Sequence, residues 1–156
     1  MKSPEERLVC LLKEKGYTVS TAESCTGGLI ASMIVNVPGC SSVFNQGFIT
    51  YANDAKVKYL GVLKETIEEY GVVSEAVVTQ MALGCANESN AETAIVTSGI
   101  AGPDGGTPEK PVGLVWMAVC IDGKVTAWSN IFEGDRSKIR YSAAKEAITK
   151  LADMLV

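Results

Sequence analysis

Residues 94–132 contain the stretches AIVTSGI (94–100), VGLVWMAVCI (112–121) and VTAWSNIF (125–132). The first two are apolar runs of strand length, which is typical of strands that are buried on both faces of a sheet. Asp122-Gly123 separates the last two stretches and predicts a type I′ turn, and therefore an antiparallel hairpin. This part of the chain thus predicts the centre of a sheet.

Helical patterns surround these strands. Ser3 and Glu6 form a capping box with Pro4 in the first turn, which predicts a helix over 4–16, and Asp135 caps a last helix with apolar residues every four positions. The other expected elements are strands at 17–21 and 43–51 and helices from Gly28 to about Val37, at 53–59, at 64–70 and after Ser74. Together they predict one α/β domain over 1–156, a three-layer α/β/α sandwich with a mixed, mostly parallel sheet.

The amino-acid composition excludes several catalytic mechanisms and classes of binding partner. The 156 residues include no histidine, which excludes Ser-His-Asp and Cys-His relays and histidine-bound metal. A net charge of −4 disfavours a nucleic acid partner, and no apolar run is long enough for a membrane span. The five dispersed cysteines predict reduced thiols and a cytoplasmic location, without a metal site. We expect no cofactor.

Two glycine-rich loops follow predicted strands, where ligands bind in open α/β sheets. In the first, Glu23–Gly28, a hydroxyl residue precedes two glycines at a helix start, which offers a nucleophile, close backbone approach and N–H donors for an oxyanion. By itself this pattern also fits Ser24 or Thr26 as a simple helix cap. The second loop, residues 98–111, has exposed amides suited to a phosphate or ribose, and an ordinary turn-rich connection fits it equally well.

A hydroxyl nucleophile needs a base, and without histidine the base is a lysine, a tyrosine or a carboxylate. The segment 51–56 offers Tyr51, Asp54 and Lys56. Lys56 begins a short helix behind a strand, where partial burial lowers a lysine pKa, whereas Lys58 points to another side and is expected in solvent. Spacing alone does not select Lys56, because most lysines are solvated.

Four stretches together resemble the CinA C-terminal domain family. They are TAESCTGG (21–28), GFITYANDAK (47–56), SGIAGPDGGT (98–107) with KPVG (110–113), and FEGDR (132–136) with Arg140, and they span nearly the whole chain in order. The resemblance implies a three-layer α/β/α fold, a homo-oligomer, and an amidohydrolase that converts nicotinamide mononucleotide (NMN) to nicotinate mononucleotide and ammonia.

Carried onto this chain, the resemblance makes Ser24 the nucleophile, Lys56 its base and Tyr51 an assisting hydroxyl. Amides near Thr26 to Gly28 are expected to hold the oxyanion. Arg136 and the second loop are candidates for the nucleotide phosphate, although Arg136 equally fits an exposed helix residue. The expected substrate-binding residues are Glu23, Cys25, Thr26, Gly27, Gly28, Ser98, Gly99, Gly102, Gly105, Gly106, Thr107 and Arg136.

Three alternatives stay open at this point. Cys25 is a rival nucleophile, because a thiol at a helix start can have a lowered pKa. A carboxylate mechanism would use Glu23 and Asp54. The chain would otherwise be a non-catalytic nucleotide-binding module that regulates a partner through the same pocket.

Overall fold

The computed structural model describes all residues, Met1–Val156, around a five-stranded sheet. The strands are β1 (Val19–Glu23), β2 (Phe44–Ile49), β3 (Thr93–Gly99), β4 (Leu114–Ile121) and β5 (Lys124–Ile131), in the order β2-β1-β3-β4-β5. β1 pairs in parallel with both β2 and β3, whereas β4 is antiparallel to β3 and β5. Four strands therefore run in one direction and β4 runs in the other, which is the predicted mixed sheet.

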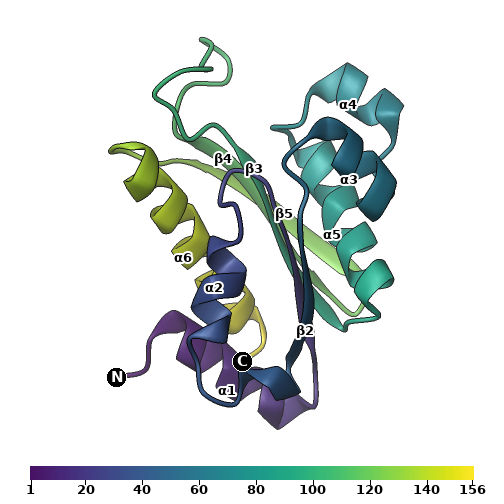
Figure 1. Ribbon diagram of the computed structural model, residues 1–156, viewed down its shortest axis with the longest axis vertical. Helices are drawn as coiled ribbons and strands as arrows, with labels where there is room; N and C mark the ends of the chain where they lie inside the picture. Colours follow the sequence, from purple (N-terminus) through teal and green to yellow (C-terminus); the bar gives the residue numbers. More distant parts are fainter.

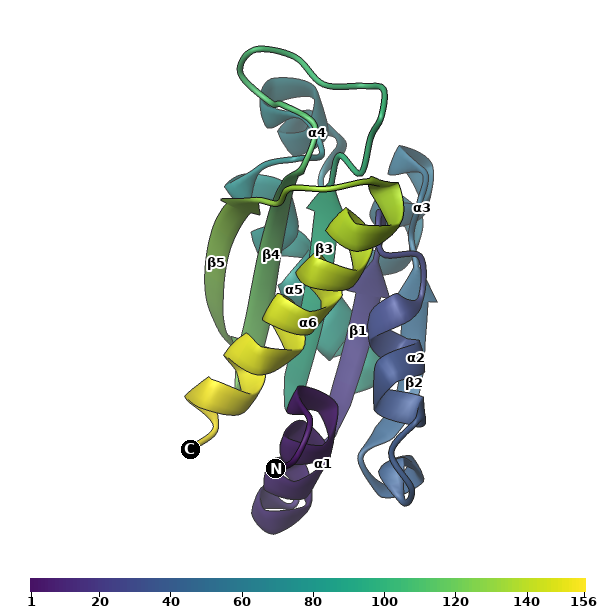
Figure 2. The ribbon, with the colours of Figure 1, turned by 90° about the vertical axis from the view of Figure 1, so that its left-hand side faces the viewer.

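Helices cover both faces of this sheet (Figures 1 and 2). One face carries α1 (Pro4–Lys15), α2 (Leu29–Val35) and α6 (Arg136–Met154). The other carries α5 (Glu75–Ser89), with α3 (Asn53–Leu60) and α4 (Lys64–Tyr70) packed on it. A short 3₁₀ turn, η1 (Cys40–Ser42), precedes β2. The three-layer α/β/α sandwich is confirmed, with one apolar core on each side of the sheet.

Local signals in the sequence set most element ends. The Ser3–Glu6 capping box is present at α1, and Gly16 ends that helix with a left-handed φ of 67°. Asp122 and Gly123 both have positive φ, as a type I′ turn requires, and they join β4 to β5. Ser74 and Asp135 accept amide hydrogen bonds as the caps of α5 and α6.

Three predicted strands, β1, β2 and β4, were placed wrongly at one or both ends. β1 is shifted by two residues from the expected 17–21, because its last residues, Ala22 and Glu23, pair with both β2 and β3. β2 ends at Ile49 rather than at Tyr51, because the carbonyls of Thr50 and Tyr51 turn toward a lysine side chain. β4 likewise begins two residues later than expected, at Leu114. In each case tertiary bonding outweighs the local pattern.

The carboxyl ends of β1, β2, β3 and β5 meet at one edge of the sheet, the upper edge in Figure 2. The loop Ser24–Gly28, the segment Thr50–Ala52 and the long loop 100–113 all start there. No helix combines the length and the apolar character that crossing a bilayer requires. The edge formed by these strand ends is where the sequence predicts the site.

Candidate functional site

Ser24 follows β1 directly and extends its pairing by one bond, because its amide donates to the Thr97 carbonyl at 3.2 Å. The Ser24 carbonyl accepts from the Gly27 amide at 3.0 Å, so the chain turns sharply after this residue. The Ser24 side chain is 8% exposed. The serine therefore sits at the edge of the sheet on a tight turn and is largely buried.

Lys56 comes to Ser24 from the opposite helical layer. It lies on α3, its side chain is fully buried, and its Nζ is 3.5 Å from Ser24 Oγ. α3 packs closely against α5, because Gly84 of α5 has no side chain and a Cβ there would overlap the Leu60 carbonyl of α3. This contact fixes the position of α3. Lys58, two residues on, is exposed beside the Tyr59 ring, as predicted. The structure thus brings together the two residues that spacing alone did not select.

The surroundings of Lys56 favour a neutral amine. Nζ donates to the carbonyls of Thr50 at 2.8 Å and Tyr51 at 3.4 Å, and it forms no ion pair. Burial lowers the Lys56 pKa below the ordinary 10.5, and the nearby Cys25 thiol opposes this only in part. A neutral amine has two N–H groups and one lone pair, so the two carbonyls leave the lone pair for the Ser24 hydroxyl.

Tyr51 is placed differently from the expectation of an assisting hydroxyl. Its side chain is 61% exposed, and its hydroxyl accepts from Arg136 Nη2 at 3.3 Å. Only the Tyr51 carbonyl contacts Lys56. Arg136 is itself exposed, and its Nη1 donates to the Gly102 carbonyl at 2.7 Å. Tyr51 and Arg136 therefore form a polar pair at the rim of the site, beside the long loop.

Glu23 is fully buried and caps a helix. Its carboxylate accepts from the amides of Ile30 at 2.8 Å and Ala31 at 3.0 Å, in the first turn of α2. Gly28 at the N-cap has no side chain to do this, so Glu23 supplies the missing acceptor from the end of β1. Asp54 is exposed on α3. The Glu23 carboxylate is therefore already bonded to the α2 amides, and the alternative mechanism that would use Glu23 and Asp54 stays a prediction.

Cys25 faces the core and is a poor nucleophile. Its side chain is 6% exposed and belongs to the apolar cluster of α1, α2 and α6. Burial raises the Cys25 pKa to about 11, although Arg140 nearby has a small opposing effect. The thiol therefore stays protonated at neutral pH. The expectation of a lowered pKa at this position was wrong, because desolvation outweighs the helix start.

The turn leaves three amides free at the serine. The N–H groups of Cys25, Thr26 and Gly28 donate to no other group of the chain, whereas the Gly27 amide is taken by Ser24. Gly27 and Gly28 have φ of 59° and 101°, which other residues rarely adopt. The Thr26 hydroxyl bonds the Thr97 hydroxyl at 2.8 Å inside the core. The loop thus offers free backbone N–H donors, and the Thr26 side chain fixes the loop to β3 through Thr97.

The long loop, residues 100–113, is bonded mainly to itself. Ile100 pairs with Leu114 and Gly113, and the Thr107 hydroxyl accepts from the Lys110 amide. Residues 103–109 are exposed, and in both ribbon views this loop projects beyond the strand ends (Figures 1 and 2). Of the predicted substrate-binding residues in this region, Ser98, Gly99 and Gly102 lie at its base, and Gly105, Gly106 and Thr107 lie in its exposed part.

A comparison with known proteins identifies the family. The family model of the CinA C-terminal domain matches residues 1–155. The chain belongs to this family. It is 52% identical to a CinA-like protein of Kosmotoga olearia over 147 residues, which is 94% of this chain and 36% of that protein. The chain spans about a third of the length of the curated relatives it matches.

Solved structures of CinA-type proteins have the same fold. A competence/damage inducible protein from Agrobacterium tumefaciens is 40% identical, with a TM-score of 0.92 over 99% of this chain and 97% of that chain. A competence or damage-inducible protein from Enterobacter asburiae is 30% identical, with a TM-score of 0.96 over the full length of both. The names of these proteins state no reaction, and the likeness establishes the CinA family and fold.

Arg140 is a residue of this CinA domain that the sequence reasoning left without a role. Its Nε donates to the Cys25 carbonyl at 2.9 Å and its Nη2 to the Thr26 carbonyl at 3.0 Å. It lies one helical turn after Arg136, so both side chains leave α6 on the same side. The spacing of four residues between Arg136 and Arg140 was the one sign in the sequence that Arg140 lies near the site. The bonds to a loop more than a hundred residues earlier were not visible in the sequence.

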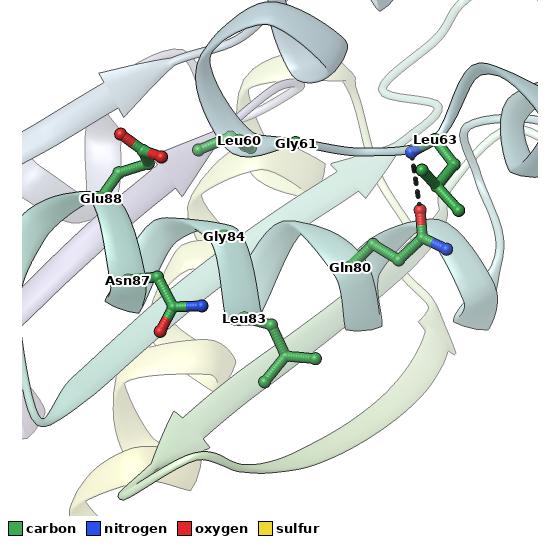
Figure 3. A pocket seen from close by; sticks show the side chains of 8 residues that line it. All are labelled: Leu60, Gly61, Leu63, Gln80, Leu83, Gly84, Asn87 and Glu88. Carbon is green, nitrogen blue, oxygen red and sulfur yellow. Dashed lines mark hydrogen bonds between the residues drawn. The ribbon is translucent and has the colours of Figure 1, made fainter.

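A second region of the CinA domain forms a pocket that has no nucleophilic side chain. A surface pocket of about 390 Å³ lies between the end of α3 and α5 (Figure 3). Its lining residues are Leu60, Gly61, Leu63, Gln80, Leu83, Gly84, Asn87 and Glu88. They include no hydroxyl, thiol or amine. No cluster of three or more metal-binding side chains occurs in the chain either. We therefore place the candidate site at Ser24 and Lys56.

Proposed function

We propose that this chain is an amidohydrolase that converts NMN to nicotinate mononucleotide and ammonia, with Ser24 as nucleophile and Lys56 as base. One observation carries the chemistry: a buried lysine without a carboxylate partner lies 3.5 Å from a serine on a tight turn. The choice of NMN rests on the resemblance to the CinA family. The 3.5 Å separation fits a site without substrate, since such hydrogen bonds often shorten when substrate binds.

The first step moves one proton and forms one bond. Neutral Lys56 takes the proton of the Ser24 hydroxyl as Ser24 Oγ attacks the carboxamide carbon, and the carbonyl electrons move onto the oxygen. The free amides of Cys25, Thr26 and Gly28 are the donors available for that oxyanion. A donor of this kind contributes about 3 kcal/mol to the stability of the transition state.

The second step releases ammonia and the third releases the acid. As the C=O bond re-forms, the C–N bond breaks and the protonated Lys56 returns its proton to the leaving nitrogen. Lys56 is then neutral again and takes a proton from a water molecule, whose oxygen attacks the ester carbon. The bond from this carbon to Ser24 Oγ breaks, Lys56 returns the proton to Ser24 Oγ, and nicotinate mononucleotide leaves. The Thr50 and Tyr51 carbonyls hold the amine in place through the cycle. This proposal gives one buried group both the base and the acid role.

The rim residues are assigned to the nucleotide. Arg136 is the exposed cation beside the site, and a guanidinium forms paired hydrogen bonds with phosphate. Tyr51 hydroxyl already contacts Arg136, so we place it at the phosphate or ribose end rather than at the proton transfer. The buried Cys25 and the capping Glu23 have no direct part in this scheme.

A coupled ammonia assay tests the proposal. We expect ammonia from NMN with the unchanged chain, none above background with Ser24→Ala, and near-normal release with Cys25→Ser. Full activity in Ser24→Ala would contradict the serine mechanism. Parallel assays with NAD and nicotinamide riboside report on the phosphate, because the riboside lacks the group assigned to Arg136.

A second outcome would favour the alternative function. If calorimetry shows that NMN binds while no ammonia appears over hours, the chain is a non-catalytic nucleotide-binding module. The expected homo-oligomer stays a prediction, which light scattering of the purified chain would check.

A further inference from the structure

The turn after Ser24 is held from the side of α6 by a single guanidinium. Arg140 is half-buried near the start of α6 and spans two successive carbonyls, those of Cys25 and Thr26. Its two bonds, at 2.9 and 3.0 Å, match the paired geometry in which arginine binds oxygen atoms. No carboxylate is paired with this arginine. Its charge is therefore directed at the peptide groups of the turn.

The Cys25–Thr26 peptide group has an unusual arrangement of partners. Its carbonyl accepts from Arg140 Nε, and its N–H, which belongs to Thr26, donates to no group of the chain. In a planar trans peptide the C=O and N–H bonds point in opposite directions. Because Arg140 fixes the carbonyl on the α6 side, the Thr26 N–H points to the opposite side of the turn.

The rest of the turn is equally fixed. The Thr26 carbonyl accepts from both Arg140 and the Leu29 amide, and the Thr26 hydroxyl bonds Thr97 in the core. Arg140 also fills the space beside Gly27, where a Cβ would lie 3.1 Å from Nη2. These contacts leave the Thr26 amide no freedom to turn back toward α6.

A cation on the carbonyl also strengthens the amide as a donor. Hydrogen bonds in a chain polarise one another, and bonds to a charged group are stronger than neutral ones. The Arg140 charge draws electrons toward the Cys25 oxygen and leaves the Thr26 N–H more positive. The effect is available before substrate binds, so it needs no rearrangement during the reaction.

We infer that Arg140 is a positioning residue that orients and polarises the Thr26 amide as an oxyanion donor for Ser24. This inference rests on the proposed serine mechanism and deepens it. Arg140 acts through the peptide group and need not touch the substrate. Arg136, one turn earlier, contacts instead a rim carbonyl and a tyrosine hydroxyl. The two arginines of α6 thus serve opposite ends of the substrate.

The experiment compares Arg140→Met, Arg140→Lys and a control, Lys145→Met, which removes an exposed cation from the same helix. The readouts are kcat and KM for ammonia release from NMN over a range of pH, and the rate at which a fluorophosphonate labels Ser24. In labelling, Lys56 takes the Ser24 proton, the Ser24 oxygen bonds phosphorus, the P–F bond breaks and fluoride leaves, and the phosphoryl oxygen takes the oxyanion position. This second readout does not depend on the amide substrate.

We expect Arg140→Met to lower kcat and the labelling rate by about 10- to 100-fold, somewhat less than the loss of a whole oxyanion donor. KM and the midpoint of the pH profile should stay unchanged, because neither the rim nor Lys56 is altered. Arg140→Lys should recover part of the loss, since an ammonium retains the charge and can bond a carbonyl. Lys145→Met should behave as the unchanged chain.

Three results would overturn the inference. The first is unchanged kcat and labelling in folded Arg140→Met, and the second is a rise in KM alone, which would make Arg140 a substrate ligand. The third applies if Arg140→Met does not fold: Arg140→Lys folds and shows unchanged kcat and labelling. Labelling of the unchanged chain without ammonia release would overturn only the NMN reaction. An unreactive Ser24 in the unchanged chain would contradict both proposals.

Discussion

The two glycine-rich loops of this CinA domain look alike in sequence and are built in different ways. The Ser24–Gly28 turn is short, and its bonds go to buried or half-buried groups: Glu23 caps the helix that follows, Thr97 holds Thr26, and Arg140 holds two carbonyls. The loop 100–113 is long and exposed over 103–109. Its ends pair with β4 and with the Phe132 amide, and side-chain bonds join Arg136 to Gly102 and Lys110 to Tyr70. Both loops are rich in glycine, so glycine content alone does not distinguish them. Hydrogen bonds to buried or half-buried groups distinguish the short turn as the preorganised one.

This difference predicts that changes around the short turn will have large effects and changes in the long loop small ones. The largest effect is expected from Lys56→Met. Losing the base should lower kcat by at least about 1000-fold. Lys58→Met, two residues on and exposed, is the matched control and should retain normal ammonia release. Normal turnover in Lys56→Met would contradict its role.

The same variant should be more stable than the unchanged chain. The unfolded chain binds a proton at Lys56 below pH 10.5, whereas burial disfavours that proton in the folded state. Stability of the unchanged chain should therefore rise with pH up to about that value, and methionine removes this cost. We expect thermal melts at neutral pH to show a Tm higher by about 2–4 °C, equivalent to about 1 kcal/mol. A lower Tm would contradict a buried neutral lysine.

The pH dependence of turnover separates the two groups that lie beside Ser24. Protonated Lys56 is inactive as a base, so kcat/KM should rise with pH, about tenfold per unit, to a midpoint below 10.5. The Cys25 thiol, with a pKa of about 11, should not contribute. Cys25→Ser should therefore leave the rising limb in place, and disappearance of the limb in this variant would assign it to the thiol.

Glu23→Gln tests the internal support of the short turn. Glutamine keeps one acceptor oxygen and turns an amide group toward an α2 N–H, which costs about 1–3 kcal/mol of folding free energy. We expect a lower Tm together with a fall in kcat of about tenfold. Glu75→Gln, an exposed change in the first turn of α5, is the control. Complete loss of activity at an unchanged Tm would instead revive Glu23 as a catalytic carboxylate.

The smallest effect is expected from Lys110→Met in the long loop. Its Nζ donates to the Tyr70 carbonyl at 2.6 Å on the surface, where such a contact contributes about 0.5 kcal/mol or less. We expect kcat within about twofold of normal and a KM raised at most a few-fold. If Lys110→Met lowers kcat as much as Glu23→Gln does, the long loop is as much a part of the reacting centre as the short turn, and the contrast between them fails.

Much of the fold was predictable because its signals are local. The Ser3 capping box, the Asp122-Gly123 turn and the Asp135 cap depend on residues a few positions apart, and all three are present in the structure. The prediction of the two loops at strand ends was also sound, because strand direction in an α/β sheet brings such ends to one edge. Side-chain contacts were harder to predict, whether the partner lies seven positions away, as for Glu23, or 85, as for Tyr51.

Glu23, Cys25 and Tyr51 illustrate this difficulty. Each has a side chain suited to catalysis, and the structure gives each another contact: an α2 amide, the apolar core and an exposed arginine. Sequence spacing cannot show which face of a turn is buried. Desolvation alone then reverses the expected reactivity of Cys25 and makes Lys56 the group suited to act as a base.

The sequence by itself determined the layers, the helix ends, the hairpin and the absence of histidine, because composition and short-range periodicity contain that information. Tertiary structure alone decided that Lys56 is fully buried against Ser24, and that Arg140 bonds the Cys25 carbonyl across 115 positions of sequence. The physical reason is that the pKa of an amine and the direction of a peptide group depend on which distant atoms exclude water from them or bond to them. Those neighbours exist only once the helices have packed on the sheet.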